Sequence, residues 1–263
     1  MNSSTIGQLT STSPRCEGAE PRRRLAGSVV ARACVSSGDR DEMYRLLCRY
    51  FCGTDRGRFE ADLQEKEAVI LLRDAESGQL QGFTTFMRIA ASIDRQEIVA
   101  FFSGDTIVDR EYWGETLLSR TWSQTVFAEA ERIGAQRPGV KAYWFLICSG
   151  YRTWRFLPVF FREFYPNPDE STPPHMQRVL DTLATTKFGN QYVAATGVVR
   201  LRGATPLRRG VADVTSERLR DPHVAFFTRM NPGHTRGDEL ACITEISRHN
   251  LTRAGQRMVS SPL

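Results

Sequence analysis

The sequence predicts a mixed α/β sheet flanked by helices, and three features of the chain carry this prediction. Residues 68–73 (AVILLR) and 79–89 are apolar runs of strand length joined by a turn, which predicts a β-hairpin. After Gly114 the apolar residues change to helical spacing, and residues 141–148 (KAYWFLIC) then form an unbroken apolar run. A helix between two such strands is typical of a crossover connection, which makes the strands parallel. Hairpins combined with a crossover indicate a mixed sheet.

The first part of the chain predicts an arm, a strand and two helices. Residues 1–26 are rich in Ser, Thr, Pro and Gly and include three consecutive arginines, which predicts a disordered arm. Residues 28–35 predict a strand. A helix capped by Asp41 and ended by Gly53 follows, and a second short helix is expected over residues 59–66. The apolar stripe of the first helix consists of Met43, Leu46, Leu47, Tyr50 and Phe51.

The middle of the chain predicts two further strands around a long helix. Residues 97–108 predict the strand that follows the hairpin, and the helix after it ends at Gly134. The run at residues 141–148 has the continuous apolar character of a central strand. The aromatic-rich segment 150–166 predicts a helix that Pro158 kinks or delays, because proline lacks a backbone donor. The apolar stripe of the long helix consists of Leu118, Trp122, Val126, Ala130 and Ile133.

The rest of the chain predicts a C-terminal extension. It covers residues 166–263 and is expected to complete or cover the sheet of a core at residues 27–165. The elements expected in it are a helix that ends at Gly189, strands at residues 192–201 and 224–230, and a short helix capped by Asp238.

Length and charge narrow the classes of function. The chain has 263 residues, which suits one large domain or a domain with an extension. No apolar run approaches the roughly 20 residues that span a membrane, so we expect no membrane span. The net charge of +5 is not carried by Lys/Arg runs interleaved with aromatic residues, so nucleic-acid binding is not favoured. A mild basic balance suits an acidic ligand such as a phosphorylated cofactor.

The cysteines and histidines show no metal-binding pattern. The six cysteines form no CxxC pair, and the four histidines have no metal-ligand spacing with them. We therefore expect no metal, and a reduced cytoplasmic protein with buried thiols. The excess of arginine over lysine is typical of a high-GC bacterial coding sequence.

The order of the predicted elements and two segments of the chain resemble the GNAT acetyltransferase superfamily. The segments are VAFFSGDTIVDREYWGETLLSRTW at residues 99–122 and AYWFLICSGYRTWRFLPVFF at residues 142–161. The resemblance covers residues 28–165 and extends more loosely to residue 230. It implies that the fourth and fifth strands splay apart and hold a thioester between them. It also implies that the loop after the fourth strand and the next helix N-terminus bind the cofactor pyrophosphate, which free amides and the helix dipole favour.

The loop in this sequence is a degenerate form of the family motif Arg/Gln-x-x-Gly-x-Gly/Ala, which indicates a divergent member. Trp113 stands at the Arg/Gln position, and Thr116 and Leu118 stand at the two small-residue positions. The resemblance implies an acyl-CoA or an acyl-carrier-protein thioester as co-substrate, with no metal. The donor-binding residues that it implies are Thr106, Ile107, Val108, Trp113, Gly114, Glu115, Thr116 and Arg152.

Two residues are candidates for proton transfer. Asp105 places a carboxylate in an apolar strand, which indicates a partner or a chemical task. With a raised pKa it would take a proton from an attacking amine, as the general base that the family often places on this strand. In the other interpretation, Asp105 lies at the solvent-exposed end of the strand and accepts a hydrogen bond from a loop amide. Tyr151 directly follows the fifth strand and is the candidate general acid.

The resemblance implies an N-acyltransferase that moves an acyl group from a thioester to an amine of a small molecule, with an acyl carrier protein as a second possible partner. Two other hypotheses stay open. The chain could be a non-catalytic GNAT-like module that binds a ligand or a protein, which the degenerate loop favours. It could also be a basic nucleic-acid-associated protein, which only the arginines of the arm and of the connector before residue 224 support.

Overall fold

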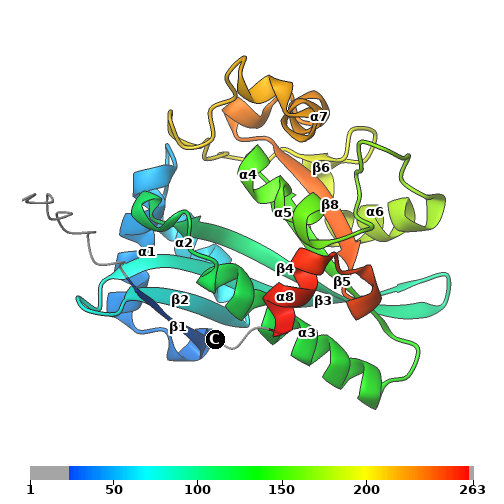
Figure 1. Cartoon of the computed structure of the whole chain (residues 1–263), viewed down its shortest axis with the longest axis horizontal. Coiled ribbons are helices and arrows are strands. Elements are labelled where there is room, and N and C mark those ends of the chain that lie inside the picture. Colours follow the sequence, from blue (N-terminus) through cyan, green and yellow to red (C-terminus); the bar gives the residue numbers. More distant parts are fainter. Residues whose placement is uncertain (1–23, 261–263) are drawn as a thin grey trace, which may run out of the picture.

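The frame of the computed structural model, which describes residues 24–260, is one mixed sheet of eight strands (Figure 1). The strands lie in the order β1-β2-β3-β4-β5-β8-β7-β6. Strands β1 to β4 pair antiparallel, β4 and β5 pair parallel, and β8 pairs antiparallel with β5. The fold class predicted from the sequence is therefore confirmed. The strands are β1 (Leu25–Ala31), β2 (Ala68–Asp74), β3 (Leu80–Ile93), β4 (Gln96–Val108), β5 (Lys141–Cys148), β6 (Tyr192–Val193), β7 (Val198–Val199) and β8 (Glu239–Glu245).

Helices cover both faces of this sheet, and α3 is the crossover between the parallel strands β4 and β5. The α-helices are α1 (Ser37–Tyr50), α2 (Arg56–Gln64), α3 (Leu117–Gln136), α4 (Tyr151–Trp154), α5 (Phe156–Phe160), α6 (Pro174–Phe188), α7 (Pro222–Met230) and α8 (Arg253–Ser260). Short 3-10 turns lie at Arg32–Cys34, Arg110–Tyr112, Gly189–Gln191, Arg218–Arg220, His234–Arg236 and Arg248–Asn250.

Alternate residues of each strand face different layers of helices. Ile70 of β2 packs into the core against α3, whereas its neighbours Val69 and Leu71 pack against α1 and α2. Phe102 of β4 contacts Phe188 of α6, with ring centroids 5.8 Å apart. Helices α1, α2 and α6 therefore share one face of the sheet, which we call the α2–α6 face. Helix α3 lies against α8 on the other face, which we call the α3 face (Figure 1).

Most elements predicted for the first 165 residues are confirmed. The β2–β3 hairpin and β4 are present, and β5 has the predicted bounds, residues 141–148. The aromatic segment is broken into α4 and α5 at Arg155, as the proline indicated. Pro158 lies in the first turn of α5, where a missing amide hydrogen is tolerated because that amide has no intrahelical partner.

The predictions for three C-terminal elements are wrong. Residues 224–230 belong to helix α7 and form no strand, because Asp221 caps the helix and Pro222 occupies its first turn. The helix expected after Asp238 is strand β8. The single strand expected over residues 192–201 is the short β6–β7 hairpin. A short apolar run suits a buried strand and a buried helix equally, so the sequence alone does not decide between them.

The ends of α1 also differ from the prediction. Ser36 caps the helix in a reciprocal capping box with Asp39, so Asp41 is not the cap. The helix ends at Tyr50, before the predicted stop at Gly53. Both corrections move a boundary by a few residues and leave the predicted apolar stripe on the buried side.

The chain enters the fold at β1, which begins at Leu25. The arm expected over residues 1–26 therefore lies, apart from its last three residues, outside the described residues. Within residues 24–260, no helix combines the length and the apolar character that crossing a membrane requires.

Two buried tyrosines of the sheet differ in whether the hydroxyl group has a hydrogen-bond partner. The hydroxyl of Tyr143 on β5 is buried and has no hydrogen-bond partner among the described residues, whereas that of Tyr192 on β6 donates to Asp181 Oδ1 at 2.7 Å. We expect Tyr192→Phe to lower the free energy of unfolding by about 1 kcal/mol and Tyr143→Phe to leave it unchanged or raise it. Urea denaturation of both variants measures this. An equal loss in the two would contradict the assignment.

Candidate functional site

Strands β4 and β5 part before they end. Their parallel pairing runs from Ile98↔Lys141 to Ser103↔Leu146 and stops there. Beyond that point β4 stays paired with β3, while the last two residues of β5 stay paired with β8. Backbone groups of β4 that point away from β3 over residues 104–108 have no strand partner within residues 24–260. This is the splay that the resemblance implied. Side chains donate to the Val108 and Gly104 carbonyls, while the groups that point away from β3 have no described strand partner.

A β-bulge turns Asp105 within this splayed segment. Thr84 pairs with Thr106 and Phe86 pairs with Ser103, so two residues of β4 oppose one residue of β3. The position needs glycine at 104, because a Cβ there would lie 2.5 Å from Thr85 Oγ1 and 2.6 Å from Lys66 Cε. At the bulge, the backbone of β4 therefore packs closely against Lys66, which precedes β2.

A buried ion pair lies beside the bulge. Lys66 is only 3% exposed, and its ammonium group contacts the Asp62 carboxylate at 2.5 Å and the Asp62 carbonyl oxygen at 3.1 Å. The same ammonium lies 5.9 Å from the centre of the Phe102 ring. Lys187 of α6 approaches this ring at 5.6 Å from its own side, so α2 and α6 meet over Phe102. Charged groups from both helices therefore surround this part of the α2–α6 face.

Two carboxyl groups beside the splay have raised pKa values. Burial raises the pKa of Asp105 to about 6, and the negative charge of Asp62 adds to this while Lys66 opposes it. Burial raises the pKa of Glu239 to about 7, a hydrogen bond from Ser149 lowers it, and the charges of Asp105 and Asp62 raise it further. Groups whose pKa values move toward neutrality at the opening of a sheet are candidates for proton transfer.

Strand alternation places both carboxyl groups on the α2–α6 face. Ile107, two residues after Asp105, packs into the core against α1 and α2. Ala241, two residues after Glu239, packs into the core against α6. Strand β5 lies between β4 and β8, so the backbones that carry the two carboxyl groups are about 10 Å apart, and the side chains span enough of this distance for the charge of Asp105 to act on Glu239.

The two predicted catalytic side chains are not brought together. Tyr151 is 4% exposed and belongs to the core on the α3 face, at the start of α4. Asp105 faces α2 instead, through its interaction with Asp62 and Lys66. A residue that sequence reasoning missed, Glu239, lies across the gap from Asp105. Little in the sequence points to Glu239, because it opens the apolar run ELACI, for which the pattern predicts a helix capped by Asp238.

The predicted donor loop is partly occupied by its own hydrogen bonds. The amides of Trp113 and Glu115 donate to the carbonyls of Arg110 and Tyr112, at 3.3 and 2.9 Å. The amides of Gly114 and Thr116 have no acceptor within residues 24–260. A Cβ added to Gly114 would meet nothing within 4 Å, so the loop is open there.

The side chains around the loop define its surface. The Trp113 indole donates to the Val108 carbonyl at 2.9 Å, and the Arg152 guanidinium lies 4.3 Å from its ring centre. Arg152 is exposed and has no ion pair with a described carboxylate. Leu118 is buried in the core, so its side chain does not crowd the loop, while Thr116 is exposed and provides no capping hydrogen bond.

The remaining donor residues of the prediction lie on the splayed part of β4. Thr106 is exposed, and its hydroxyl lies 2.6 Å from that of Thr84. The side chain of Ile107 is buried against α1 and α2, and that of Val108 is half-buried against the opposite core. Their backbone groups, rather than their side chains, border the gap.

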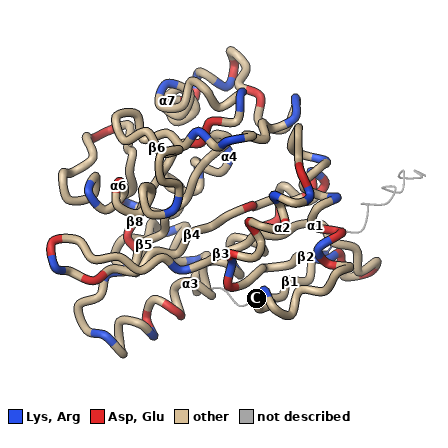
Figure 2. Tube along the Cα trace, turned by 180° about the vertical axis from the view of Figure 1, so that it is seen from behind, with Lys and Arg blue, Asp and Glu red and all other residues tan. Residues whose placement is uncertain are grey.

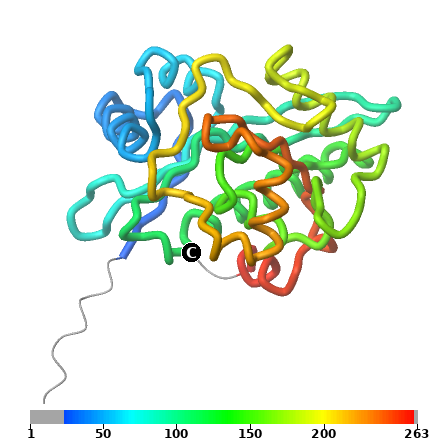
Figure 3. Tube along the Cα trace, turned by 90° about the horizontal axis from the view of Figure 1, so that it is seen from above, coloured from blue at the N-terminus to red at the C-terminus, as the bar shows by residue number. Residues whose placement is uncertain are grey.

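A connecting segment, residues 201–214, crosses the carboxyl ends of β4 and β5 (yellow in Figure 3). The Cys52 amide donates to the Pro206 carbonyl and the Arg208 amide to the Tyr50 carbonyl, both at 2.8 Å. A Cβ added to Gly150 would lie 3.0 Å from Ala212. The segment therefore ties the C-terminal region to α1 next to the splay.

Basic residues line a hollow of about 360 Å³ beside the donor loop. Arg49 pairs with the buried Asp109 at 2.8 Å, and Arg110 donates to the Gly210 carbonyl at 3.0 Å. Elsewhere acidic and basic residues are interspersed along the trace (Figure 2). The hollow is lined by Arg49, Tyr50, Asp109, Arg110, Glu111, Arg208, Arg209 and Val211.

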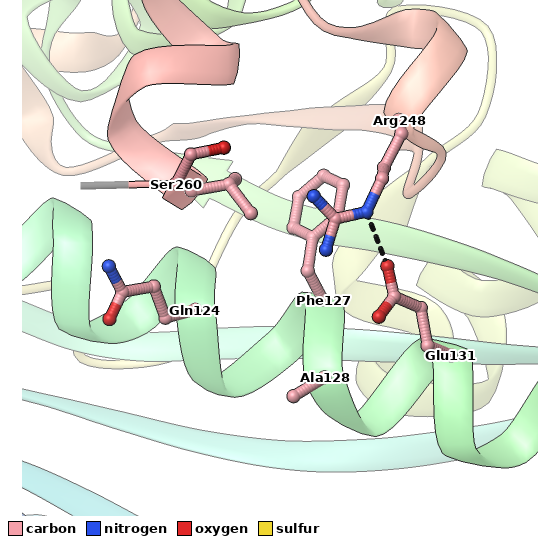
Figure 4. A pocket seen from close by; sticks show the side chains of 7 residues that line it. Gln124, Phe127, Ala128, Glu131, Arg248 and Ser260 are labelled. Atoms are coloured by element: carbon pink, nitrogen blue, oxygen red, sulfur yellow. Dashed lines mark hydrogen bonds and ion pairs between the residues drawn. The ribbon is translucent and has the colours of Figure 1, made fainter. Parts of the chain in front are cut away.

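A second hollow, of about 370 Å³, lies between α3 and α8 (Figure 4). Arg248 closes one side of it through an ion pair with Glu131 at 2.6 Å. It opens on the α3 side of the molecule, away from Asp105 and Glu239. Across residues 24–260, no cluster of three His, Cys, Asp or Glu side chains is arranged to hold a metal ion.

Strand order, the parallel β4–β5 pair with its crossover helix, and the splay define a GNAT-like fold. No protein-family model matches the chain, and no curated protein matches it. The solved structures that resemble it include the GNAT family N-acetyltransferase YhbS from Escherichia coli in complex with CoA, at 18% identity over 53% of this chain and 71% of that one, with a TM-score of 0.34.

Two further structures have similar scores. A probable N-acyltransferase from Enterococcus faecalis is 16% identical over 54% of this chain, with a TM-score of 0.39, and the match spans 33% of its length. Arabidopsis thaliana NAA60 in complex with acetyl-CoA is 12% identical over 54% of this chain and 87% of that one, with a TM-score of 0.38. These values assign no substrate, ligand or residue role to this chain.

The raised carboxyl pKa values predict how stability depends on pH. Both groups bind protons more tightly in the folded than in the unfolded state, whose carboxyl pKa values lie near 4. Their contribution to stability is therefore full below about pH 4 and is lost as the pH rises through 6 and 7. We expect Asp105→Asn and Glu239→Gln to raise the Tm at pH 8 and to change it little at pH 4.

Thermal melts at the two pH values measure this effect. Glu97→Gln is the matched control, because Glu97 is an exposed carboxylate of β4 and forms only a surface contact with Arg137 at 3.6 Å. A lower Tm at pH 8 in both site variants would show that the two carboxyl groups do not oppose folding.

Proposed function

We propose that this protein transfers an acyl group from a thioester, either an acyl-CoA or an acyl-carrier-protein thioester, to an amine of a small molecule. The observation that supports this most is the splay of β4 and β5 with a half-buried carboxyl group of raised pKa, Asp105, at its edge. A thioester in the gap would present its carbonyl to backbone amides of residues 104–108 that have no described strand partner on that side. An amine that approaches over the α2–α6 face would meet Asp105.

The charge of the α2–α6 face supports a basic acceptor. Three carboxyl groups, Asp62, Asp105 and Glu239, share this region with the ammonium of Lys66, while the ammonium of Lys187 beside it is paired with Glu65. Such an excess of negative charge attracts a protonated amine and repels an anionic acceptor. Above about pH 6 Asp105 is ionised, so once the bound amine has released its ammonium proton to solvent, Asp105 can accept the N–H proton that the nitrogen gives up as it attacks.

The donor's phosphates would bind at the other end of the splay. The free amides of Gly114 and Thr116 and the N-terminus of α3 lie there, and α3 has no acidic residue in its first turn. The exposed guanidinium of Arg152 lies over Trp113 at the same place. Acyl transfer then depends on holding donor and acceptor together and on polarising the thioester carbonyl.

The transfer itself is a direct displacement. The amine nitrogen forms a bond to the thioester carbonyl carbon, and the carbon–sulfur bond breaks. The proton of the amine passes to Asp105, and the thiolate leaves with the electron pair of the broken bond. The products are an amide and a thiol, so no oxidant, reductant or metal takes part in the balance.

A thiol-release assay with a panel of acyl-CoAs, acyl-carrier-protein thioesters and small amines tests this proposal. We expect Asp105→Asn to lower kcat/KM by about 100-fold or more, because an amide accepts no proton. The wild-type rate should fall below about pH 6, where Asp105 is protonated, and Glu97→Gln should keep the wild-type rate. Full activity of Asp105→Asn would remove Asp105 from the mechanism. Ligand binding without thiol release from any thioester would favour the non-catalytic binding module.

The donor loop is tested by binding alone. We expect Arg152→Ala to weaken CoA binding about tenfold, which corresponds to one lost charge-assisted contact. The Tm rise on adding CoA, which follows from mass action, measures this. Arg178→Ala is the control, because Arg178 pairs with Asp94 at 2.8 Å on the surface. If neither CoA nor any acyl thioester, free or on a carrier protein, raises the wild-type Tm, the donor assignment fails.

A further inference from the structure

Glu239 has an unusual position for a carboxyl group. It is the first residue of β8, and the register Cys148↔Leu240 brings it beside Ser149, directly after the end of β5. It is half-buried, and its described hydrogen-bond partner is the Ser149 side chain. No described arginine or lysine forms an ion pair with it. A half-buried carboxyl group without a cation partner favours its protonated form.

The position of Glu239 complements that of Asp105. Asp105 stands on the β4 side of the splay and Glu239 on the β5–β8 side, and both point to the α2–α6 face. Groups that border the same gap from its two sides can act on the two ends of a reacting bond. Asp105 is reached by an amine over the α2–α6 face, and Glu239 borders the side on which β5 ends.

We propose that Glu239 is the general acid that gives its proton to the departing thiolate, while Asp105 takes the proton of the attacking amine. This assignment rests on the acyl transfer proposed above. Glu239 acts as a catalytic residue in it, because its carboxyl proton passes to the reacting sulfur. In this proposal Glu239 of β8 takes the general-acid role that the sequence predicted for Tyr151.

In this step Asp105 gains one proton and Glu239 loses one. The bond between nitrogen and the carbonyl carbon forms as the N–H proton moves to Asp105, and the carbon–sulfur bond breaks as the Glu239 proton moves to sulfur. Asp105 is then protonated and Glu239 ionised. The net return of one proton from Asp105 to Glu239, through solvent, restores the starting state, and no other co-reactant is needed.

The surroundings of Glu239 favour this division of roles. Burial is the largest effect and raises the pKa of Glu239, the Ser149 hydrogen bond from β5 opposes it, and the charges of Asp105 and Asp62 raise it further, to about 7. Asp105 has Lys66 beside it and the lower pKa, about 6. A pair of carboxyl groups held at different pKa values supplies an ionised base and a protonated acid at the same pH.

Other nearby groups are poorer candidates for the acid. Tyr151 lies in the core of the α3 face. Cys148 is fully buried on that same face, and burial first, with Cys242 and then Glu239 adding to it, raises the pKa of its thiol well above the ordinary value. Neither side chain borders the gap on the side where Asp105 lies.

The dependence on the leaving group tests the proposal. The donors are two thioesters of the same acyl group, one of N-acetylcysteamine and one of thiophenol, with an amine that the wild type accepts. A more acidic thiol leaves without protonation. We expect Glu239→Gln to lower kcat/KM on the order of 100-fold for the alkyl thioester and less than tenfold for the aryl thioester. Asp105→Asn should slow both equally, and Glu245→Gln, a control on the same strand, should slow neither.

The pH profile gives a second, independent readout. The wild-type rate should fall above about pH 7 as Glu239 ionises, and Glu239→Gln should lack this alkaline limb. Ser149→Ala removes a hydrogen bond that lowers the pKa of Glu239, so it should move the limb to higher pH while leaving Glu239 in place.

Two results would overturn the proposal. Equal losses of Glu239→Gln with alkyl and aryl thioesters would show that Glu239 only supports the fold, as would an alkaline limb that Ser149→Ala leaves unmoved. A wild-type protein that releases no thiol from any donor of the panel, the two small thioesters included, with any of the amines would instead refute the proposed function itself, and the inference with it. The two failures are therefore distinguishable.

Discussion

Past Ser103 and Leu146, strands β4 and β5 stop hydrogen-bonding to each other, while each keeps its outer neighbour. The rest of the site depends on this parting. A sheet loses a strand pairing only where other contacts hold both strands in place, because unpaired backbone groups are costly. Strand β3 holds β4 through the bulge at Gly104, and β8 holds the end of β5. The C-terminal region is thus what allows the gap to exist.

The charged groups beside the gap impose a cost on folding that a purely structural sheet would avoid. Lys66 is almost fully buried and depends on Asp62, and Asp105 and Glu239 are held in surroundings that oppose their ionisation. Ionisable groups whose pKa values are shifted by burial and by neighbouring charges are concentrated at functional sites. The glycine of the bulge belongs to the same arrangement, because any Cβ would displace the lysine.

Sequence reasoning found one half of the candidate site. Asp105 was detectable because a carboxylate interrupts an apolar strand. Glu239 gave no such contrast, since it begins a short apolar run whose strand character depends on β5. Tyr151 was placed correctly after β5 but faces the other side of the sheet. In the donor loop, which amides are free depended on the local turns at Arg110 and Tyr112, which the motif does not specify.

By itself, the sequence determined the local elements: the hairpin, the crossover, the bounds of β5 and the anomalous carboxylate on β4. Apolar periodicity and turn residues specify these, because they act over a few residues. Only the tertiary structure decided that the run after Asp238 is a strand, that it lies beside β5, and that it carries Glu239 to the gap. Periodicity reports which side of an element is buried. It does not report what buries it, and pairing between strands far apart in the chain has no local signal.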